Sequence, residues 1–284
     1  MKRIKLTVSY DGTNYVGWQV QKNGLAVEQV LNEELSRLLG EDIAVIGASR
    51  TDSGVHALGN VAVFDTRTRI PPEKISYALN QSLPEDIRIA RSEEVPLSFH
   101  PRKERCAKTY RYNILNSRYN IPVLRLYSDY VYYPMDLEKM RQGAVYLKGE
   151  HDFTGFSSSG GQQKTSVRTI YSLDIEAEEL GSFKDNGGLF MFGDEGAKEP
   201  LKASGHPGGE YAPRMVSLTV RGNGFLYNMV RIIAGTLEKV AMGVYPPEYI
   251  KKILDSRDRS LQTSKAPARG LTLMSIDYGD SAEK

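Results

Sequence analysis

The sequence of 284 residues contains one cysteine, Cys106, and only four histidines. A single cysteine excludes an internal disulfide and a cysteine-rich metal centre. The histidines stand at positions 56, 100, 151 and 206, without the spacing that metal ligands show. We therefore expect no metal site, and the lone cysteine suits a reducing cytoplasm.

Long apolar runs are also missing. The first residues, Met1-Lys2-Arg3-Ile4-Lys5, contain no apolar signal segment, and no later stretch is long and apolar enough to cross a bilayer. An excess of charge is missing too, because 37 basic residues against 35 acidic ones leave a net charge of +2. We expect a cytoplasmic protein, whose overall charge alone says little about a nucleic-acid partner.

The most informative segment is residues 50–57, Arg-Thr-Asp-Ser-Gly-Val-His-Ala, which places a cation, a carboxylate and an imidazole beside a turn-forming glycine. Strand-like residues precede it at 42–48 and follow it at 59–66. Asp52 is therefore expected in a loop between two strands, where catalytic groups are commonly carried. Taken alone, the octapeptide is equally typical of a solvated surface turn.

This octapeptide resembles the signature of the TruA family of tRNA pseudouridine synthases, in which the aspartate is catalytic. Other segments resemble that family in the same order along the chain. They are Tyr10–Gln21, Val27–Leu31, Lys108–Tyr112, His151–Phe156, Gly224–Arg231 and Ala266–Leu271. The resemblance covers almost the whole chain, so it is far more specific than any single motif.

The resemblance implies an α+β fold of two RNA-recognition-like halves, joined by a continuous antiparallel sheet with a central catalytic cleft. It implies isomerisation of uridine to pseudouridine at positions 38, 39 and 40 of the anticodon stem-loop of tRNA. The reaction involves no redox change and no group transfer, so no cofactor is expected. The family also implies a homodimer, with one tRNA lying across both subunits.

The resemblance assigns roles to four residues. Asp52 is the catalytic carboxylate, and Arg231 is similar to the arginine that pairs with it and favours its ionised form. Tyr110 corresponds to the tyrosine that holds the flipped base, since an aromatic ring can stack on it. Arg50 resembles the arginine that contacts the displaced nucleotide. For His56 a structural hydrogen bond is favoured over a role as general acid.

A basic segment precedes and enters the strand that carries Tyr110. Residues 102–111 hold five cations and one acid. Cations beside aromatic residues suit phosphates and a stacked base together. We therefore predict RNA binding by these cations, which are Arg102, Lys103, Arg105, Lys108 and Arg111.

Hydrophobic periodicity predicts alternating strands and helices. Leu6, Val8 and Tyr10 follow the period of two of a strand, and Val27 begins an apolar helical face that Gly40 ends. Further strands are expected at 42–48, 59–66, 86–91, 108–116, 167–178, 214–222 and 271–278. Further helices are expected at 135–147, from Phe225 to Val240 and from Pro246 to Leu254.

We predict two domains. The first, 1–105, carries the aspartate loop, and the second, 106–284, contains a flexible glycine-rich insertion at 181–213 with eight glycines in 33 residues. A surface insertion is favoured over a lid that touches RNA or the other subunit.

Two other classes of protein remain as alternatives. A non-catalytic RNA-binding protein would keep the fold and the basic strand, but the retained Asp52 argues against it. A hydrolase using Asp52 and His56 would need a second carboxylate or a nucleophile at recognisable spacing, which the sequence does not show.

Overall fold

A computed structural model describes residues 1–161, 164–180 and 212–279 of the chain. These residues contain ten strands and five α-helices, so the fold is mixed α+β, as predicted. They form two compact units. Unit 1 consists of Met1–Tyr110 together with the described residues from Thr272 onward, and unit 2 of Arg111–Leu271. The boundaries therefore differ from the predicted 1–105 and 106–284, because the last strand returns to the first unit.

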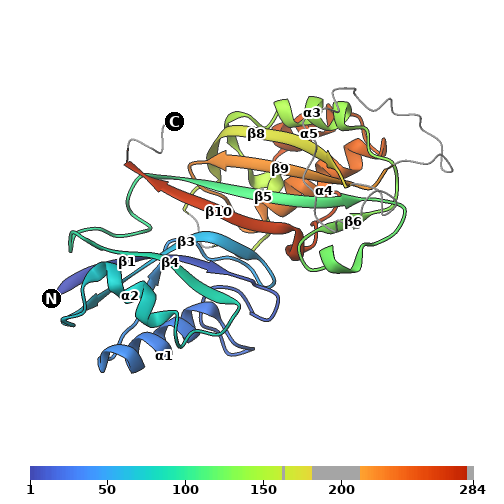
Figure 1. Ribbon diagram of the computed structural model, residues 1–284. Coiled ribbons are helices and arrows are strands. Elements are labelled where there is room, and N and C mark those ends of the chain that lie inside the picture. Colours follow the sequence, from blue (N-terminus) through green and yellow to red (C-terminus); the bar gives the residue numbers. More distant parts are fainter. Residues whose placement is uncertain (162–163, 181–211, 280–284) are drawn as a thin grey trace. The chain divides into compact units, whose positions relative to one another are not determined.

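Unit 1 is a sheet with two helices on one face (Figure 1). The central strand β1 lies antiparallel to β3 on one side and to β4 on the other, and β2 pairs with β3. The elements are β1 (Lys2–Tyr10), α1 (Val27–Leu39), β2 (Ile46–Gly47), β3 (His56–Thr66), α2 (Pro72–Leu79), β4 (Ile87–Val95) and β10 (Leu271–Tyr278).

The predicted periodicities of β1 and α1 are confirmed. Alternate residues of β1 are buried, and Leu6 and Val8 have no exposed surface. Helix α1 buries its apolar face and ends at Gly40, which adopts the left-handed conformation with φ of 65°. Glycine is favoured there because it has no Cβ to clash with the turn.

The strand predicted at 42–48 is wrong except at Ile46–Gly47. The backbone N–H of Ile43 donates to the Ser36 hydroxyl at 2.9 Å, and that of Val45 donates to the Asn32 side-chain oxygen at 2.8 Å. Side chains of α1 therefore take the hydrogen bonds that a strand neighbour would otherwise make.

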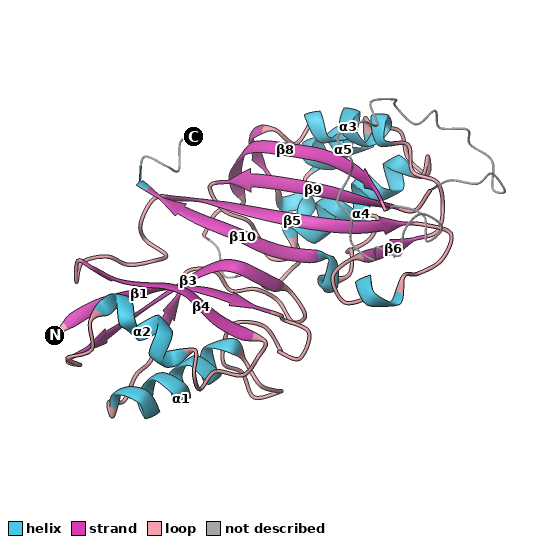
Figure 2. Ribbon diagram, in the orientation of Figure 1, coloured by secondary structure: helices cyan, strands magenta, loops and turns pink. Residues whose placement is uncertain are grey.

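Unit 2 also combines a sheet with helices on one face (Figure 2). Strand β9 pairs antiparallel with β8, and β8 with β7. The elements are β5 (Cys106–Asn116), which begins in unit 1, β6 (Asp129–Val131), α3 (Leu137–Val145), β7 (Gly149–Asp152), β8 (Val167–Glu179), β9 (Arg214–Gly222), α4 (Met229–Ala241) and α5 (Tyr249–Ser256). Short 3-10 helices occupy Pro122–Leu124, Thr154–Phe156, Arg259–Leu261 and Ala268–Gly270.

The prediction of a purely antiparallel sheet is wrong at two places. Strand β10 runs parallel to β3, with Thr272 opposite His56, and β6 runs parallel to β5, with Ile114 opposite Asp129. Residues distant in the sequence form the first pair, and local periodicity carries no information about such pairing.

The helix expected to start at Phe225 begins instead at Met229. Asn228 immediately before it has φ of 60°, which no residue inside a right-handed helix adopts. The predicted insertion at 181–213 falls almost entirely outside the described residues. Strands β8 and β9, which flank it, are paired as far as Glu179 and Arg214.

None of the helices in the described ranges combines the length and the apolarity that a membrane crossing demands.

Candidate functional site

Asp52 lies in the loop that connects β2 to β3, as predicted. Strand β3 starts at His56, earlier than expected, so the loop is confined to a few residues. The Asp52 side chain is half-buried and that of Arg50 is exposed. Both make further interactions, so neither is a free surface group.

The N-terminal motif holds this loop through its backbone. Gly17 forms an isolated antiparallel bridge with Asp52, and the N–H of Trp18 donates to the carbonyl oxygen of Thr51 at 3.1 Å. The carbonyl oxygen of Tyr15 accepts the N–H of Gly54 at 3.3 Å. Two segments far apart in the sequence thus fix the backbone that carries the carboxylate.

Two glycines of this motif allow the close approach. A Cβ at Gly12 would lie 2.0 Å from the carbonyl oxygen of Val55. A Cβ at Gly17 would lie 2.5 Å from the carbonyl oxygen of Thr51, and Gly17 also has φ of 108°. Glycine is required at both positions, because the contacting atoms belong to the backbone and cannot rotate away.

Buried hydroxyls and an amide anchor the base of the loop. The Tyr10 hydroxyl hydrogen-bonds to the Thr51 hydroxyl at 2.7 Å, and the Ser49 hydroxyl to that of Tyr110 at 2.9 Å. The side-chain amide of Asn60 donates to the carbonyl oxygen of Ser49 at 3.1 Å. Because buried hydrogen bonds of this kind are costly to break, the loop has a defined position.

The structure brings Tyr110 close to Asp52. Burial raises the pKa of Tyr110 to about 12, the hydrogen bond from Ser49 opposes this, and the negative charge of Asp52 raises the pKa further. The side chain is 7% exposed, and its hydroxyl is fixed by Ser49. Tyr112, two residues further along β5, is completely buried.

His56 makes the structural hydrogen bond expected of it. Its Nδ1 accepts the N–H of Gly12 at 3.1 Å, and the same atom lies 3.1 Å from the Asp11 carboxylate. The imidazole is 5% exposed. It therefore ties the N-terminal motif to the start of β3.

The predicted RNA-binding cations separate into three groups. Arg102, Lys103 and Arg105 are exposed on the turn before β5. Lys108 donates to the carbonyl oxygen of Ala48 at 3.0 Å, so its ammonium group supports the aspartate loop. Arg111 belongs to unit 2, where its Nε donates to the Thr219 hydroxyl at 3.3 Å.

Arg231 lies in the first turns of α4 in unit 2. Its Nε donates to the carbonyl oxygen of Ala266 at 2.8 Å, and a terminal nitrogen donates to the side-chain oxygen of Asn228 at 3.1 Å. The amide nitrogen of Asn228 in turn donates to the Ser158 hydroxyl at 3.0 Å. The sequence analysis assigned no role to Asn228, although it lies within the motif Gly224–Arg231.

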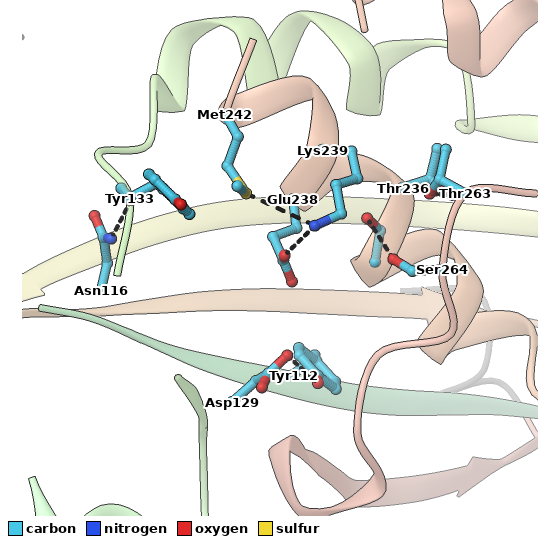
Figure 3. Close-up of polar contacts among 11 residues, drawn as sticks. Tyr112, Asn116, Asp129, Tyr133, Thr236, Glu238, Lys239, Met242, Thr263 and Ser264 are labelled. Carbon is cyan, nitrogen blue, oxygen red and sulfur yellow. Dashed lines mark hydrogen bonds and ion pairs between the residues drawn. The ribbon is translucent and has the colours of Figure 1, made fainter. Parts of the chain in front are cut away.

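A buried polar cluster in unit 2 was also missed. Glu238 projects from α4 toward β5, where the Tyr112 hydroxyl lies 3.3 Å from the Asp129 carboxylate (Figure 3). Burial raises the pKa of Glu238, and the charge of Asp129 raises it further, while Lys239 at 3.3 Å opposes this. These groups surround the core tyrosine and are separate from the aspartate loop in sequence.

The described part of the chain brings no three His, Cys, Asp or Glu side chains together as candidate metal ligands.

Comparisons with known proteins show the family to which the chain belongs. The family model for tRNA pseudouridine synthase matches residues 6–102 and 144–279. The tRNA pseudouridine synthase A of Ruminiclostridium cellulolyticum is 45% identical over 278 residues, which cover 98% of this chain and 100% of that relative. Proteins of the same name from Thermoanaerobacter sp. and Brevibacillus brevis are 40% and 41% identical with the same coverage. The chain therefore belongs to the tRNA pseudouridine synthase family of isomerases.

Proposed function

We propose that the protein converts uridine to pseudouridine in the anticodon stem-loop of tRNA, at positions 38, 39 and 40, with Asp52 as its single catalytic carboxylate and no cofactor. The observation that supports this most directly is the backbone bridge between Gly17 and Asp52 beside Tyr110. A carboxylate held in place by two segments and close to an aromatic residue meets the needs of a reaction on a flipped base.

The reaction breaks the bond between C1′ of the ribose and N1 of the uracil, turns the base, and forms a bond between C1′ and C5. The proton at C5 is released to solvent and the freed N1 takes up a proton from solvent, so atoms and electrons balance without a cofactor. Asp52 adds to C6 of the ring, adds to C1′, or removes the proton from C2′, and all three routes use one ionised carboxylate.

The other residues act on the same nucleotide in this proposal. Tyr110 holds the flipped base, which costs a few kcal/mol to take out of the stack. Arg50, exposed beside Asp52, contacts the displaced nucleotide with a guanidinium that both stacks and donates to oxygens. Arg231 pairs with Asp52 and favours its ionised form.

The RNA backbone is bound by the cations predicted from the sequence. They are Arg102, Lys103, Arg105, Lys108 and Arg111. Of these, Lys108 acts by supporting the loop as well as by its charge. The protein works as a homodimer in the cytoplasm, where its tRNA substrate is found.

Tritium release from unmodified tRNA labelled at C5 of uridine tests the proposal. The wild type should release tritium, and Asp52→Ala should release none while its affinity for tRNA stays within about 2-fold. Asp42→Asn is the matched control, because Asp42 is an exposed carboxylate in the same unit. Mapping of pseudouridine in the product tests positions 38–40.

If the wild type binds tRNA without releasing tritium, the protein is an RNA-binding protein and the proposal fails. If Asp52→Ala releases tritium as fast as the wild type, another group carries out the reaction.

A further inference from the structure

A polar pocket of about 340 Å³ lies in unit 2. We call it the serine-rich pocket; its wall includes Ser158, Ser159, Lys164, Thr165, Tyr227 and Arg259. Its volume lies within the range of sites that bind small ligands.

The hydrogen-bonding pattern shows that Ser158 has a proton to donate. Arg231 has only donors, so the Asn228 oxygen must face it, and the Asn228 amide nitrogen must face Ser158. The Ser158 oxygen therefore accepts a hydrogen bond, which leaves the hydroxyl proton for another partner. Thr165 is similar, because its hydroxyl oxygen accepts the N–H of Val167 at 3.2 Å.

The charges on the pocket wall are positive. Lys164 and Arg259 line it, and no carboxylate is among the described residues that do so. Arg259 is held by hydrogen bonds from its Nε to the Ser157 carbonyl oxygen at 3.0 Å and from a terminal nitrogen to the Ser157 hydroxyl at 3.4 Å. This leaves its other terminal nitrogen for a ligand.

Two carboxylates lie beside pocket residues in the sequence. Asp258 accepts hydrogen bonds from the N–H and the hydroxyl of Ser260, both at 2.8 Å, and Asp152 also has its own partners. It accepts hydrogen bonds from the N–H and the hydroxyl of Thr154 at 3.0 and 2.7 Å, and Arg257 lies 3.4 Å away. Burial raises its pKa, but the hydrogen bonds from Ser166 and Thr154 outweigh this, so the net shift is downward. Its charge is thus compensated locally, and two cations and two hydroxyl protons remain for an acceptor-rich anion.

We propose that the serine-rich pocket binds a phosphodiester group of the RNA substrate, which rests on the proposed function. Phosphate oxygens only accept hydrogen bonds, so they match a wall that offers donors and positive charge. A phosphate bound to Ser158 would also hold the amide of Asn228 and, through it, the guanidinium of Arg231. Occupation of the pocket then positions Arg231, the arginine proposed to pair with Asp52.

The salt dependence of tRNA binding tests this. Each phosphate contact contributes about 0.7 to 0.9 to the slope of log affinity against log salt. Lys164→Gln should lower that slope by about 1 relative to wild type, with unmodified tRNA transcript as the probe. The matched control is Lys148→Gln, since Lys148 is a partly exposed lysine of the same unit that is not on the pocket wall.

Ser158→Ala provides a second measurement, because it removes a hydroxyl and little volume. In single-turnover tritium release at saturating tRNA, its rate should fall several-fold, while its melting temperature should stay near that of the wild type. Equal salt slopes for wild type, Lys164→Gln and Lys148→Gln would overturn the pocket proposal even if the wild type is fully active. An inactive wild type whose salt slope still falls with Lys164→Gln would overturn the proposed function and support the pocket.

Discussion

Replacing Gly17 by alanine should both displace the aspartate loop and destabilise the fold. The new Cβ would lie 2.5 Å from the Thr51 carbonyl oxygen, 3.0 Å from the Asp52 carbonyl carbon and 3.2 Å from the Ser53 nitrogen. All three are backbone atoms, so no side-chain rotation can relieve the contact. The loop must move by about half an ångström to bring the shortest distance to 3.0 Å.

Gly40→Ala supplies the control for backbone strain. Gly40 also has positive φ, at 65°, but a Cβ there would have no atom within 4 Å. Forcing alanine into a left-handed conformation costs about 1–2 kcal/mol. Gly17→Ala adds an overpacking cost of about 1–3 kcal/mol, so we expect a total of about 2–5 kcal/mol. The effect of alanine on the unfolded chain is the same in both variants and cancels.

Urea denaturation measures both free energies of unfolding, and single-turnover tritium release measures the reaction. A displacement of 1 Å can reduce a reaction rate by about 100-fold, so a shift of half that size should slow Gly17→Ala by about 10-fold. Affinity for tRNA should change little, because residue 17 is not among the predicted RNA-binding residues. Gly40→Ala should react at the wild-type rate.

Two results would refute this reasoning. Equal free energies of unfolding for Gly17→Ala and Gly40→Ala would mean that the loop does not approach residue 17 as closely as described. A wild-type reaction rate in a destabilised Gly17→Ala would mean that the bridge to Asp52 does not control the position of the carboxylate.

Three further predictions concern other groups. Burial raises the pKa of Tyr110 from 10.0 to about 12, so the folded state retains the phenol proton more tightly than the unfolded state does. The free energy of unfolding of the wild type should therefore fall as pH rises from 10 towards 12. Urea denaturation at pH 9 and 11 should show a smaller fall for Tyr110→Phe. Burial and the charge of Asp129 raise the pKa of Glu238 above its usual 4.5, so ionisation of Glu238 should destabilise the folded state as pH rises above 4.5. Glu238→Gln should remove this fall from the plot of melting temperature against pH. An unchanged plot would contradict the raised pKa of Glu238. Asn228→Gly keeps a left-handed backbone accessible but removes the oxygen that Arg231 contacts, so single-turnover tritium release should slow. Asn228→Ala removes the same oxygen and also disfavours the left-handed backbone. Its free energy of unfolding should therefore be lower than that of Asn228→Gly.

Local patterns predicted the elements that local forces determine. The alternation in β1 and the glycine that ends α1 are properties of a few neighbouring residues, and both are found in the structure. The loop position of Asp52 followed from strand-like residues on either side of it. The family came from resemblance, since no composition or period distinguishes a pseudouridine synthase from other α+β proteins.

The features that sequence reasoning missed depend on distant partners. Residues 42–45 have strand-like side chains, but Ser36 and Asn32 of α1 take two of their backbone hydrogen bonds. Asn228 was predicted to be helical, but its left-handed backbone means that the helix begins only at Met229. The serine-rich pocket is formed by loops that meet only in the folded unit, and the roles of the candidate site residues remain predictions.

The parallel pairing of β10 with β3 has a consequence for synthesis of the protein. His56, the residue at which the aspartate loop enters β3, is opposite Thr272 of β10. While the ribosome is still making the middle of the protein, that edge of β3 has no neighbour from β10. Closing so long a loop is slow, because the chain loses conformational entropy before the stabilising contacts between β3 and β10 form. The aspartate loop thus acquires its neighbouring strand only after Thr272 and Leu273 have been synthesised, and shorter products would carry Asp52 without that strand.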